Sequence, residues 1–318
     1  MHHGKLSKNL AKGLSVLRER IDKAKIPSSK LDETLNLATW NVRELGKRAR
    51  FPESVHYVAE ILGQFDVIAL TELRADVGDL GRIMDILGPT WRVVFSDYNL
   101  DDAGNHERIG YLYDKRAATF TGLAAEADPR KTKVGDKYIS DFEWWRSPYM
   151  ASFRAGNFDF ILLTCHIRWG NGTADRIEEL SGLAQWIDDR ASEGHMIDKD
   201  LIVMGDFNIP SRRSSTFKAL TKDGKGLKLP KALETRHVKT NLAQNANFDQ
   251  ILHLATDEGR FTDHAGTLDF YCDDHQALFP GRKLSLDKFT FQLSDHFPLW
   301  IQVNCDIDGQ RLDQVLNR

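Results

Sequence analysis

The stretch LIVMGDFNIP, residues 201–210, places four consecutive apolar side chains directly before Gly-Asp-Phe-Asn. Such a short apolar run cannot cross a membrane, and the polar residues on either side of it are typical of a buried strand inside a sheet. Residues two apart in an extended strand point to the same side, so we expect Asp206 and Asn208 to project together from its end. The motif alone is equally compatible with a turn, because Gly, Asp and Asn all accept turn geometry.

Other predicted strands end in the same way. The runs LNLATWN, VIALTE and ILLTCH finish at a polar side chain, FDQIL carries one near its start, and SDH stands immediately before FPLW. The polar residues at these further positions are Asn41, Glu72, His166, Asp249, Asp295 and His296. One polar ending is a turn, whereas a whole series of them indicates a functional site at the ends of the strands.

Predicted strands alternate with amphipathic helices along the chain. Residues 52–62 and 174–191 show apolar side chains at helical spacing, with Pro52 at a plausible first turn. The segment YMASFRAGNFDFILLTCHI, residues 149–167, predicts two antiparallel strands joined by a turn at Gly156 and Asn157, and two final strands are expected at 248–254 and 298–303. No glycine-rich fingerprint follows the first strand, so an α/β sandwich is favoured over a dinucleotide-binding fold.

The chain is expected to form one catalytic domain with short additions at both ends. Residues 1–30 predict a basic amphipathic helix and a linker, residues 31–305 the catalytic domain, and residues 306–318 a tail. The helix is interpreted as packing on the main domain rather than docking on a membrane or nucleic acid. Hydrophilic stretches at 97–108, 124–136 and 211–228 are predicted to be long loops.

Composition narrows the functional class only a little. The 318 residues carry a net charge of −3, with 41% apolar and 28% charged residues, which is an ordinary balance for a soluble globular protein. Three widely spaced cysteines without a CxxC pair predict neither a disulfide framework nor a zinc ribbon. The N-terminal segment has no continuous apolar region, so we expect a cytoplasmic protein without stable membrane association. The oligomeric state is left open.

The residue types at the strand ends point to metal-assisted phosphoryl chemistry. Glu72, Asp206 and Asp295 offer carboxylate oxygens, and Asn41 and Asn208 offer amide groups, without any thiolate. This set suits Mg²⁺, with Mn²⁺ or Ca²⁺ as alternatives, better than a closed zinc site. In phosphoryl transfer such an ion neutralises phosphate charge, while one histidine deprotonates water and another assists the leaving oxygen.

The ordered set TWNVRELG, ALTELRAD, LLTCHI, VMGDFN, FDQIL and LSDHFPL resembles the endonuclease/exonuclease/phosphatase superfamily, and within it the pancreatic-type deoxyribonuclease branch. The resemblance covers roughly residues 35–303. It implies a four-layer α/β/β/α sandwich, in which two packed mixed β-sheets are flanked by helices. It also implies that Glu72 is the main metal ligand with Asn41 and Asp295 beside it, and that Asp206 and Asn208 orient the water and stabilise the pentacovalent phosphorus.

The same resemblance assigns the acid and base groups. It implies that His296 is a general acid/base oriented by Asp249, and that His166 is its counterpart across the scissile phosphate. The branch gives this second histidine a glutamate partner, and the aromatic pattern of ERIGYLYD places Glu107 there.

Two arginines match the phosphate-contacting arginines of the branch. These are Arg43 in NVRELG and Arg146 in WWRSPYMASF. The abasic-site repair branch would have Asp where Arg43 stands, and Thr71 replaces the Gln that often precedes the ligand glutamate. The resemblance therefore points away from an enzyme specialised for abasic sites.

Three functions remain to be compared. The leading one is a metal-dependent nuclease that cuts DNA, or also RNA, by in-line attack of water. The alternative keeps the same centre but acts on phosphoinositide or phospholipid head groups, and the third is an inactive scaffold. Basic and aromatic residues suit a groove along a nucleic-acid backbone, among them Arg168, Trp169, Arg212 and Arg213. A nucleic acid, DNA first, is the expected partner.

Overall fold

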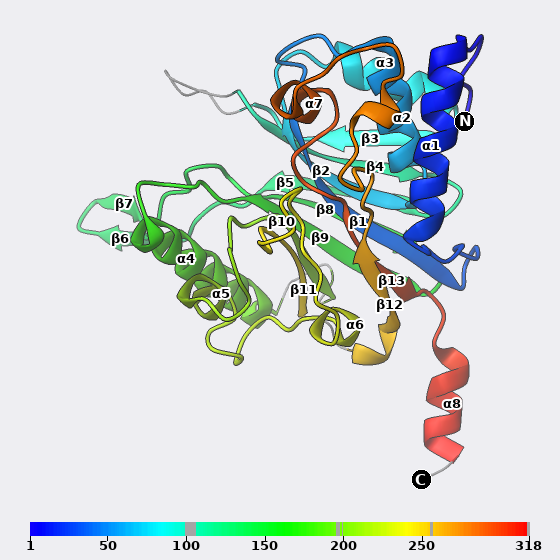
Figure 1. Cartoon of the computed structure of the whole chain (residues 1–318). Helices are drawn as coiled ribbons and strands as arrows, with labels where there is room; N and C mark the ends of the chain where they lie inside the picture. Colours follow the sequence, from blue (N-terminus) through cyan, green and yellow to red (C-terminus); the bar gives the residue numbers. More distant parts are fainter. Residues whose placement is uncertain (99–105, 195–197, 199, 255–256, 317–318) are drawn as a thin grey trace.

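Two β-sheets pack face to face and helices cover their outer sides, as Figure 1 shows. The computed structural model describes residues 1–98, 106–194, 198, 200–254 and 257–316. The predicted four-layer α/β/β/α sandwich of two mixed sheets is confirmed. Three hydrophobic clusters fill the spaces between the layers, one between the sheets and one on each outer side.

The first sheet is mixed and has the strand order β12-β13-β1-β2-β4-β3. Its strands are β1 (Thr34–Leu45), β2 (Val67–Leu73), β3 (Trp91–Phe95), β4 (Arg108–Asp114), β12 (Phe261–Thr267) and β13 (Leu299–Asn304). Strands β1 and β2 run parallel, and the other neighbours are antiparallel.

The second sheet has the order β11-β10-β9-β8-β5, with β9 and β10 parallel. Its strands are β5 (Thr119–Glu126), β8 (Tyr149–Ala155), β9 (Phe158–His166), β10 (Leu201–Asp206) and β11 (Asp249–Leu254). The turn predicted between β8 and β9 is confirmed, and Gly156 supplies its positive φ of 51°. A separate hairpin consists of β6 (Lys131–Val134) and β7 (Lys137–Ser140).

Helices form the two outer layers. The first sheet is covered by α1 (Lys8–Lys23), α2 (Pro52–Leu62), α3 (Gly78–Leu87) and α7 (Leu286–Gln292), and the second by α4 (Thr173–Ser192) and α5 (Ser215–Leu220). Shorter helical elements are α6 (Lys231–Glu234), η1 (Glu258–Arg260) and η2 (Gln276–Leu278), and α8 (Asp308–Leu316) follows the last strand. The N-terminal helix buries Leu10, Leu14, Leu17 and Ile21 in the same cluster as α2 and β1.

Side-chain alternation in the strands directs the polar strand ends toward the space between the sheets. In β1, Leu37 lies in the inter-sheet cluster while Trp40 faces the helices. In β10, Ile202 and Met204 lie in the inter-sheet cluster. Because strand side chains alternate with a period of two, Asp206 continues on the inter-sheet side, as Asn41 does in β1.

Some predicted loops contain regular structure. The 124–136 stretch holds the end of β5 and all of β6, and the 211–228 stretch holds α5. Strand β6 is exposed at every position, so its sequence carries no alternating apolar signal. The prediction also missed β12 and the helix α8 in the tail. The 97–108 stretch lies largely outside the described residues.

In the described part of the chain, no helix combines the length and apolar character needed to cross a bilayer.

Candidate active site

Three functional side chains form a row across the second sheet. Asp206 at the end of β10 pairs with His166 of β9 on one side and with Asp249 of β11 on the other. Residues at paired positions of adjacent strands point to the same face, so all three side chains face the first sheet. All three are buried. The polar strand endings of the sequence thus meet in one place.

Asn41 connects this row to the first sheet. Its Nδ2 donates to Oε1 of Glu72 at 2.8 Å and to Oδ2 of Asp206 at 3.1 Å. Its Oδ1 accepts a hydrogen bond from the backbone N–H of Arg43 at 2.9 Å. The carboxylates of Glu72 and Asp206 therefore lie on either side of a single amide group.

The backbone around Glu72 departs from regular strand geometry. Plain alternation in β2 would turn Glu72 toward the helices with Leu70, but its φ is +62° and the pairing register shifts next to it. Arg43 and Glu44 of the neighbouring strand also have positive φ values, 36° and 52°. Such bulges re-aim a side chain, and strained residues of this kind gather at functional sites. The bulge brings Oε2 of Glu72 within 2.9 Å of the backbone N–H of Glu44.

His296 is held by Asp249. The distance from His296 Nδ1 to Asp249 Oδ2 is 2.7 Å, and the carbonyl oxygen of His296 accepts a hydrogen bond from Trp40 Nε1 at 2.9 Å. Burial disfavours the charged imidazole, but Asp249 and Asp206 more than offset this and raise the pKa of His296 well above its usual value. The ring is therefore fixed in orientation, with Nε2 directed toward Asp206.

His166 has a corresponding partner in Glu107, which immediately precedes β4. Its Nδ1 lies 2.7 Å from Glu107 Oε2. Arg74 and Arg146 also contact this carboxylate, at 3.2 and 3.0 Å. Burial alone would raise the pKa of Glu107, but the three cationic neighbours lower it to about 2. Glu107 thus remains ionised, and its charge raises the pKa of His166 against the effect of burial.

Asp206 and Asn208 do not lie in one extended strand, and the turn that the sequence left open as an alternative forms here. Strand β10 ends at Asp206, and Asn208 has a φ of +50°. The backbone N–H of Asn208 donates to Asp206 Oδ1 at 2.9 Å, and its side-chain amide donates to the carbonyl of Ile167 at 2.7 Å. The asparagine therefore fixes one oxygen of Asp206 and leaves the other, Oδ2, facing the two histidines.

Asp295 and the two predicted phosphate-binding arginines lie around this centre. Arg43 approaches Asp295 at 3.6 Å, contacts Thr290 and covers the ring of Phe291. Asp295 is 45% exposed, and among the described residues its only ion pair is with Arg43. Arg146 is engaged by Glu107 rather than facing outward. The structure thus brings Arg43 and Asp295 together at the rim.

A metal ion could be held by Asp206, Asp249 and His296. One potential ligand atom from each of these buried residues lies within 4.8 Å of the others. This set differs from the predicted ligands Glu72, Asn41 and Asp295. The nearby oxygens of Glu72 and Asp206 have no thiolate beside them, and this donor set fits a hard divalent cation. The residues present therefore fit a metal site, without fixing which ion it takes.

Sequence reasoning missed Arg74. This buried residue donates to Glu107 and, at 2.9 Å, to Glu44, and its guanidinium lies 3.7 Å from Glu72. Arg74 stands two residues after Glu72 in TELRAD, and this position next to a polar strand end could have marked it as a residue of the site.

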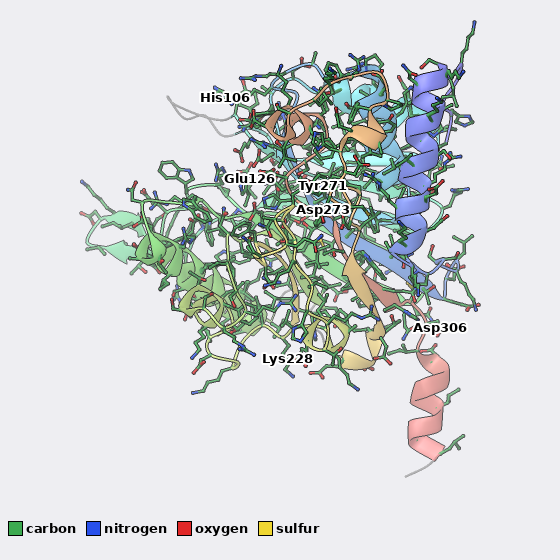
Figure 2. All side chains as sticks on the ribbon, viewed as in Figure 1. His106, Glu126, Lys228, Tyr271, Asp273 and Asp306 are labelled. Carbon is green, nitrogen blue, oxygen red and sulfur yellow. The ribbon has the colours of Figure 1, made fainter. Side chains whose placement is uncertain are left out.

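A cavity of about 570 Å³ lies beside His296. Phe248 and Thr290 line it, together with Tyr271 and Asp273 from the segment between β12 and α7, which are labelled near the centre of Figure 2. Its size is within the usual range for small-molecule and nucleotide sites.

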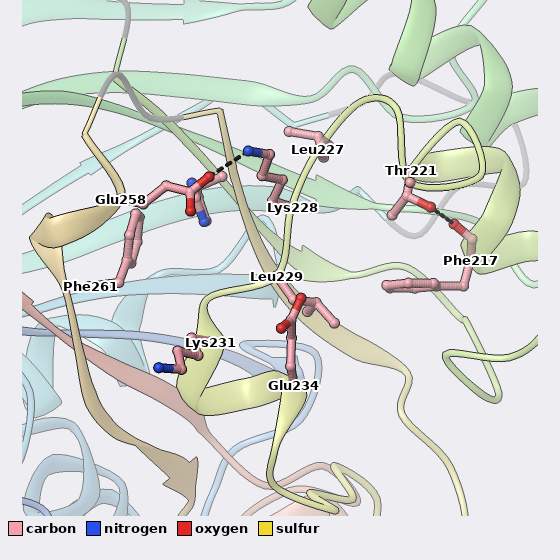
Figure 3. Close-up of a pocket in the computed structure, with 11 residues that line it drawn as sticks. Phe217, Thr221, Leu227, Lys228, Leu229, Lys231, Glu234, Glu258 and Phe261 are labelled. Carbon is pink, nitrogen blue, oxygen red and sulfur yellow. Dashed lines mark hydrogen bonds and ion pairs between the residues drawn. The ribbon is translucent and has the colours of Figure 1, made fainter.

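A second cavity, of about 520 Å³, is drawn in Figure 3. It is lined by Phe261 and His253, and Lys228 and Glu258 form an ion pair in it. His253 lies four residues along β11 from Asp249, which corresponds to about 13 Å of strand. This cavity contains none of the predicted site residues.

The chain is similar to a known protein family and to one curated protein. Residues 38–296 match the endonuclease/exonuclease/phosphatase family. A protein named deoxyribonuclease from Thioalkalivibrio sp. (strain K90mix) is 31% identical over 192 residues. The match takes in 58% of this chain but only 49% of that relative, so the chain spans about half the length of the curated protein it matches.

Solved structures share the fold at low sequence identity. TDP2 of D. rerio, solved with a single-strand DNA product, gives a TM-score of 0.57 at 17% identity, covering 85% of this chain and 99% of that one. A mannosyl-6-phosphatase of Bacteroides thetaiotaomicron gives 0.54 at 15%, covering 85% and 99%. The human Nocturnin catalytic domain with bound sulfate gives 0.53 at 15%, covering 87% and 96%. At these identities the likeness concerns the fold alone.

Proposed function

Because the chain belongs to the endonuclease/exonuclease/phosphatase family, we propose that it is a metal-dependent nuclease that hydrolyses phosphodiester bonds of DNA. The observation that carries the proposal is the shared approach of two imidazoles to one oxygen. Nε2 of His166 and Nε2 of His296 each lie 3.8 Å from Asp206 Oδ2. Two proton-transfer groups thus stand on either side of one carboxylate, as in-line displacement at phosphorus requires.

Each residue then has a defined task. Asp206, fixed by Asn208, orients the attacking water. His296, held by Asp249, takes up the proton of that water in its neutral form, which its raised pKa restricts to the more alkaline part of the pH range. His166, held by Glu107, delivers a proton to the departing oxygen.

The cation has its own set of residues. Glu72 and Asp206 would hold a divalent cation, Mg²⁺ by donor type, while the Nδ2 of Asn41 donates to both carboxylates and fixes their positions. Of the cluster around Asp206, Asp249 and His296 are then left for proton transfer. When bound, the ion supplies positive charge that neutralises the phosphate oxygens.

An aromatic path beside the site favours a polynucleotide substrate. The ring of Phe248 lies 5.8 Å from that of His296, and the ring of Trp169 lies 5.7 Å from Phe248. Trp169 is 56% exposed, and the guanidinium of Arg176 lies 4.5 Å from the centre of its ring. Exposed aromatic rings next to cations are a common platform for stacking nucleic-acid bases. The relative named deoxyribonuclease agrees with this substrate class.

A substrate panel tests the proposal. Purified protein in Mg²⁺ would be given end-labelled single-stranded DNA, duplex DNA and RNA, with phosphoinositides and mannose 6-phosphate as competing substrate classes. We expect cleavage of polynucleotide to exceed phosphate release from the lipid and the sugar by at least about tenfold in kcat/KM. Release of phosphate from a lipid or sugar without cleavage of any polynucleotide would show that the family chemistry serves a different substrate.

A further inference from the structure

A strongly basic pocket lies outside the catalytic residues described above. It has a volume of about 450 Å³, and we call it the basic pocket. Its charged and titratable lining consists of Arg212, Arg213, Arg236, Lys239, His237 and a single carboxylate, Glu234. Four cations against one carboxylate stand out in a protein whose net charge is −3.

The protein supplies only one carboxylate, Glu234, to balance the four cations of the pocket. Within the described ranges, none of them forms an ion pair. Arg212 donates to the carbonyl of Leu233 and to Gln250, Arg236 donates to the carbonyl of Asp263, and Lys239 donates to the amide oxygen of Asn247; all of these acceptors are uncharged. Positive charges that outnumber the nearby negative charges repel one another, and a bound anion relieves this repulsion.

The pocket has a structured floor. Arg212 is half-buried, and its Nε lies 3.1 Å from Oε1 of Gln250, a buried residue of β11. Burial lowers the pKa of Arg212 to about 10, so the side chain stays charged at neutral pH. Arg213 and Arg236 are exposed, and neither forms an ion pair with any residue that the structure describes. One fixed guanidinium and two accessible ones suit the branched oxygens of a phosphate group.

The basic pocket is adjacent to the active site along the chain. Asn247 lines the pocket, and Asp249, which holds His296, follows two residues later, so about 7 Å of chain separates them. The residue between them, Phe248, lines the cavity beside His296. Ser211 also lines the basic pocket, five residues after Asp206. A strand of nucleic acid can therefore reach both places within a few nucleotides.

We propose that the basic pocket binds a phosphodiester group of the same polynucleotide whose scissile phosphate lies at Asp206. This inference rests on the proposed nuclease function and adds a second contact point on the substrate backbone. The second contact would hold the strand in register with the catalytic residues, since phosphate contacts set position rather than sequence preference.

Binding without turnover tests the site directly. Fluorescence anisotropy in EDTA would measure the affinity for a labelled single-stranded 12-mer between 50 and 300 mM salt. The variant is Arg213→Gln/Arg236→Gln, which removes two exposed charges from the basic pocket. The matched control is Lys133→Gln/Lys137→Gln, which removes two exposed, unpaired charges from the β6 and β7 hairpin. We expect only the arginine variant to lose about tenfold or more in affinity. The slope of log K against log salt concentration should become shallower by about 1.4, because each lost phosphate contact on single-stranded DNA contributes about 0.7.

Turnover of a small diester separates this site from the catalytic centre. Bis(4-nitrophenyl) phosphate has a single phosphate group, which cannot lie at Asp206 and in the basic pocket at the same time, so the arginine variant should hydrolyse it at the wild-type rate. If wild-type protein cleaves DNA while both double variants show equal affinity and salt slope, the basic pocket is not a substrate contact and the nuclease proposal stands. Loss of small-diester turnover in the arginine variant would likewise overturn the inference. If wild-type protein neither binds nor cleaves any polynucleotide, both proposals fail.

Discussion

His166 and His296 approach the same atom, Oδ2 of Asp206, with their Nε2 nitrogens both at 3.8 Å. One ring comes from β9 and the other from the segment between α7 and β13, and each is fixed on its other nitrogen by a buried carboxylate at 2.7 Å. Such an arrangement positions two imidazoles on one reacting group without any movement of the backbone. Because each histidine has its own carboxylate partner, the contribution of each histidine–carboxylate pair can be measured separately by mutation.

Removing one imidazole should abolish most activity while leaving the fold intact. For His296→Ala we expect kcat/KM on DNA to fall by about 10³-fold, the usual contribution of a positioned general acid or base. The melting temperature should fall by only a few degrees, because the buried Asp249 can take up a proton once its partner is gone. Steady-state kinetics and thermal unfolding check both. His264→Ala, at an exposed position, is the control. A variant retaining a tenth of wild-type activity would exclude the role of His296.

Glu107→Gln should weaken both stability and the pH response of the enzyme. The pKa of Glu107 is lowered to about 2, so its stabilising effect is present above pH 4.5 and is lost as the pH falls toward 2. At pH 7 the variant should lose roughly 3 kcal/mol, because Arg74 and His166 are left without their buried counter-charge. Urea unfolding should show this gap closing at low pH. A constant gap between pH 7 and pH 2.5 would contradict the ionised state of Glu107.

The same variant has a kinetic readout. Without the Glu107 charge, the pKa of His166 should fall, so this general acid should lose its proton earlier and the alkaline limb of the kcat/KM profile should move to lower pH. Asp159→Asn breaks an exposed pair with Arg154 and serves as the matched control, with no measurable loss of stability expected and no change in the profile.

His253 should limit stability in mild acid. Its side chain is 3% exposed, and burial lowers its pKa to about 4, so the folded protein resists the protonation that the unfolded chain undergoes. A His that gains an anionic partner stabilises the fold at low pH, whereas the buried neutral His253 destabilises it there. The free energy of unfolding is therefore highest above pH 6.5 and declines as the pH falls from 6.5 to 4. The His253 ring stacks on Phe261, and His253→Phe replaces it by a ring that cannot take up a proton. The variant should therefore lack up to roughly 3 kcal/mol of this decline. Denaturant unfolding at pH 7.5 and 4.5 would test it, and equal pH dependence in both proteins would refute it.

Arg20 of α1 should matter for the cavity beside His296. Its buried guanidinium donates to the carbonyl oxygens of Phe270, Tyr271 and Asp274, each at 2.8 Å. Arg20→Met leaves three acceptors without a donor, so we expect a loss of about 2–4 kcal/mol and a several-fold rise in KM, because Tyr271 lines the cavity. Lys23→Met on the same helix should change neither. An unchanged KM would mean that this segment does not contact substrate.

The sequence predicted those parts of the site that follow from strand periodicity. Asp206, His166 and Asp249 end or begin predicted strands, and register alone brings them into one row. The partners of the two histidines followed only from the family resemblance, since 59 residues separate Glu107 from His166. Pattern within one strand carries no information about contacts between sheets.

Other features depend on local backbone geometry that no residue pattern specified. The bulge that redirects Glu72 and the turn that takes Asn208 out of the strand both use positive φ at non-glycine residues. Glu rarely adopts such a conformation unless the surrounding structure imposes it, whereas Asn adopts it more readily, so the sequence allowed the turn at Asn208 without specifying it. Likewise, the four cations of the basic pocket come from two segments more than 20 residues apart in the sequence, and only the fold brings them together.

The most direct test of the account is the conversion of supercoiled plasmid by wild-type protein and by Asp206→Asn, each in Mg²⁺ and in EDTA. The substitution keeps the size of the side chain while removing the charge that faces both histidines. The account predicts nicking by wild-type protein in Mg²⁺, none in EDTA, and a loss of at least about 10³-fold in the variant, with unchanged circular dichroism. Nicking by Asp206→Asn at the wild-type rate, or nicking by wild-type protein that persists in EDTA, would contradict it.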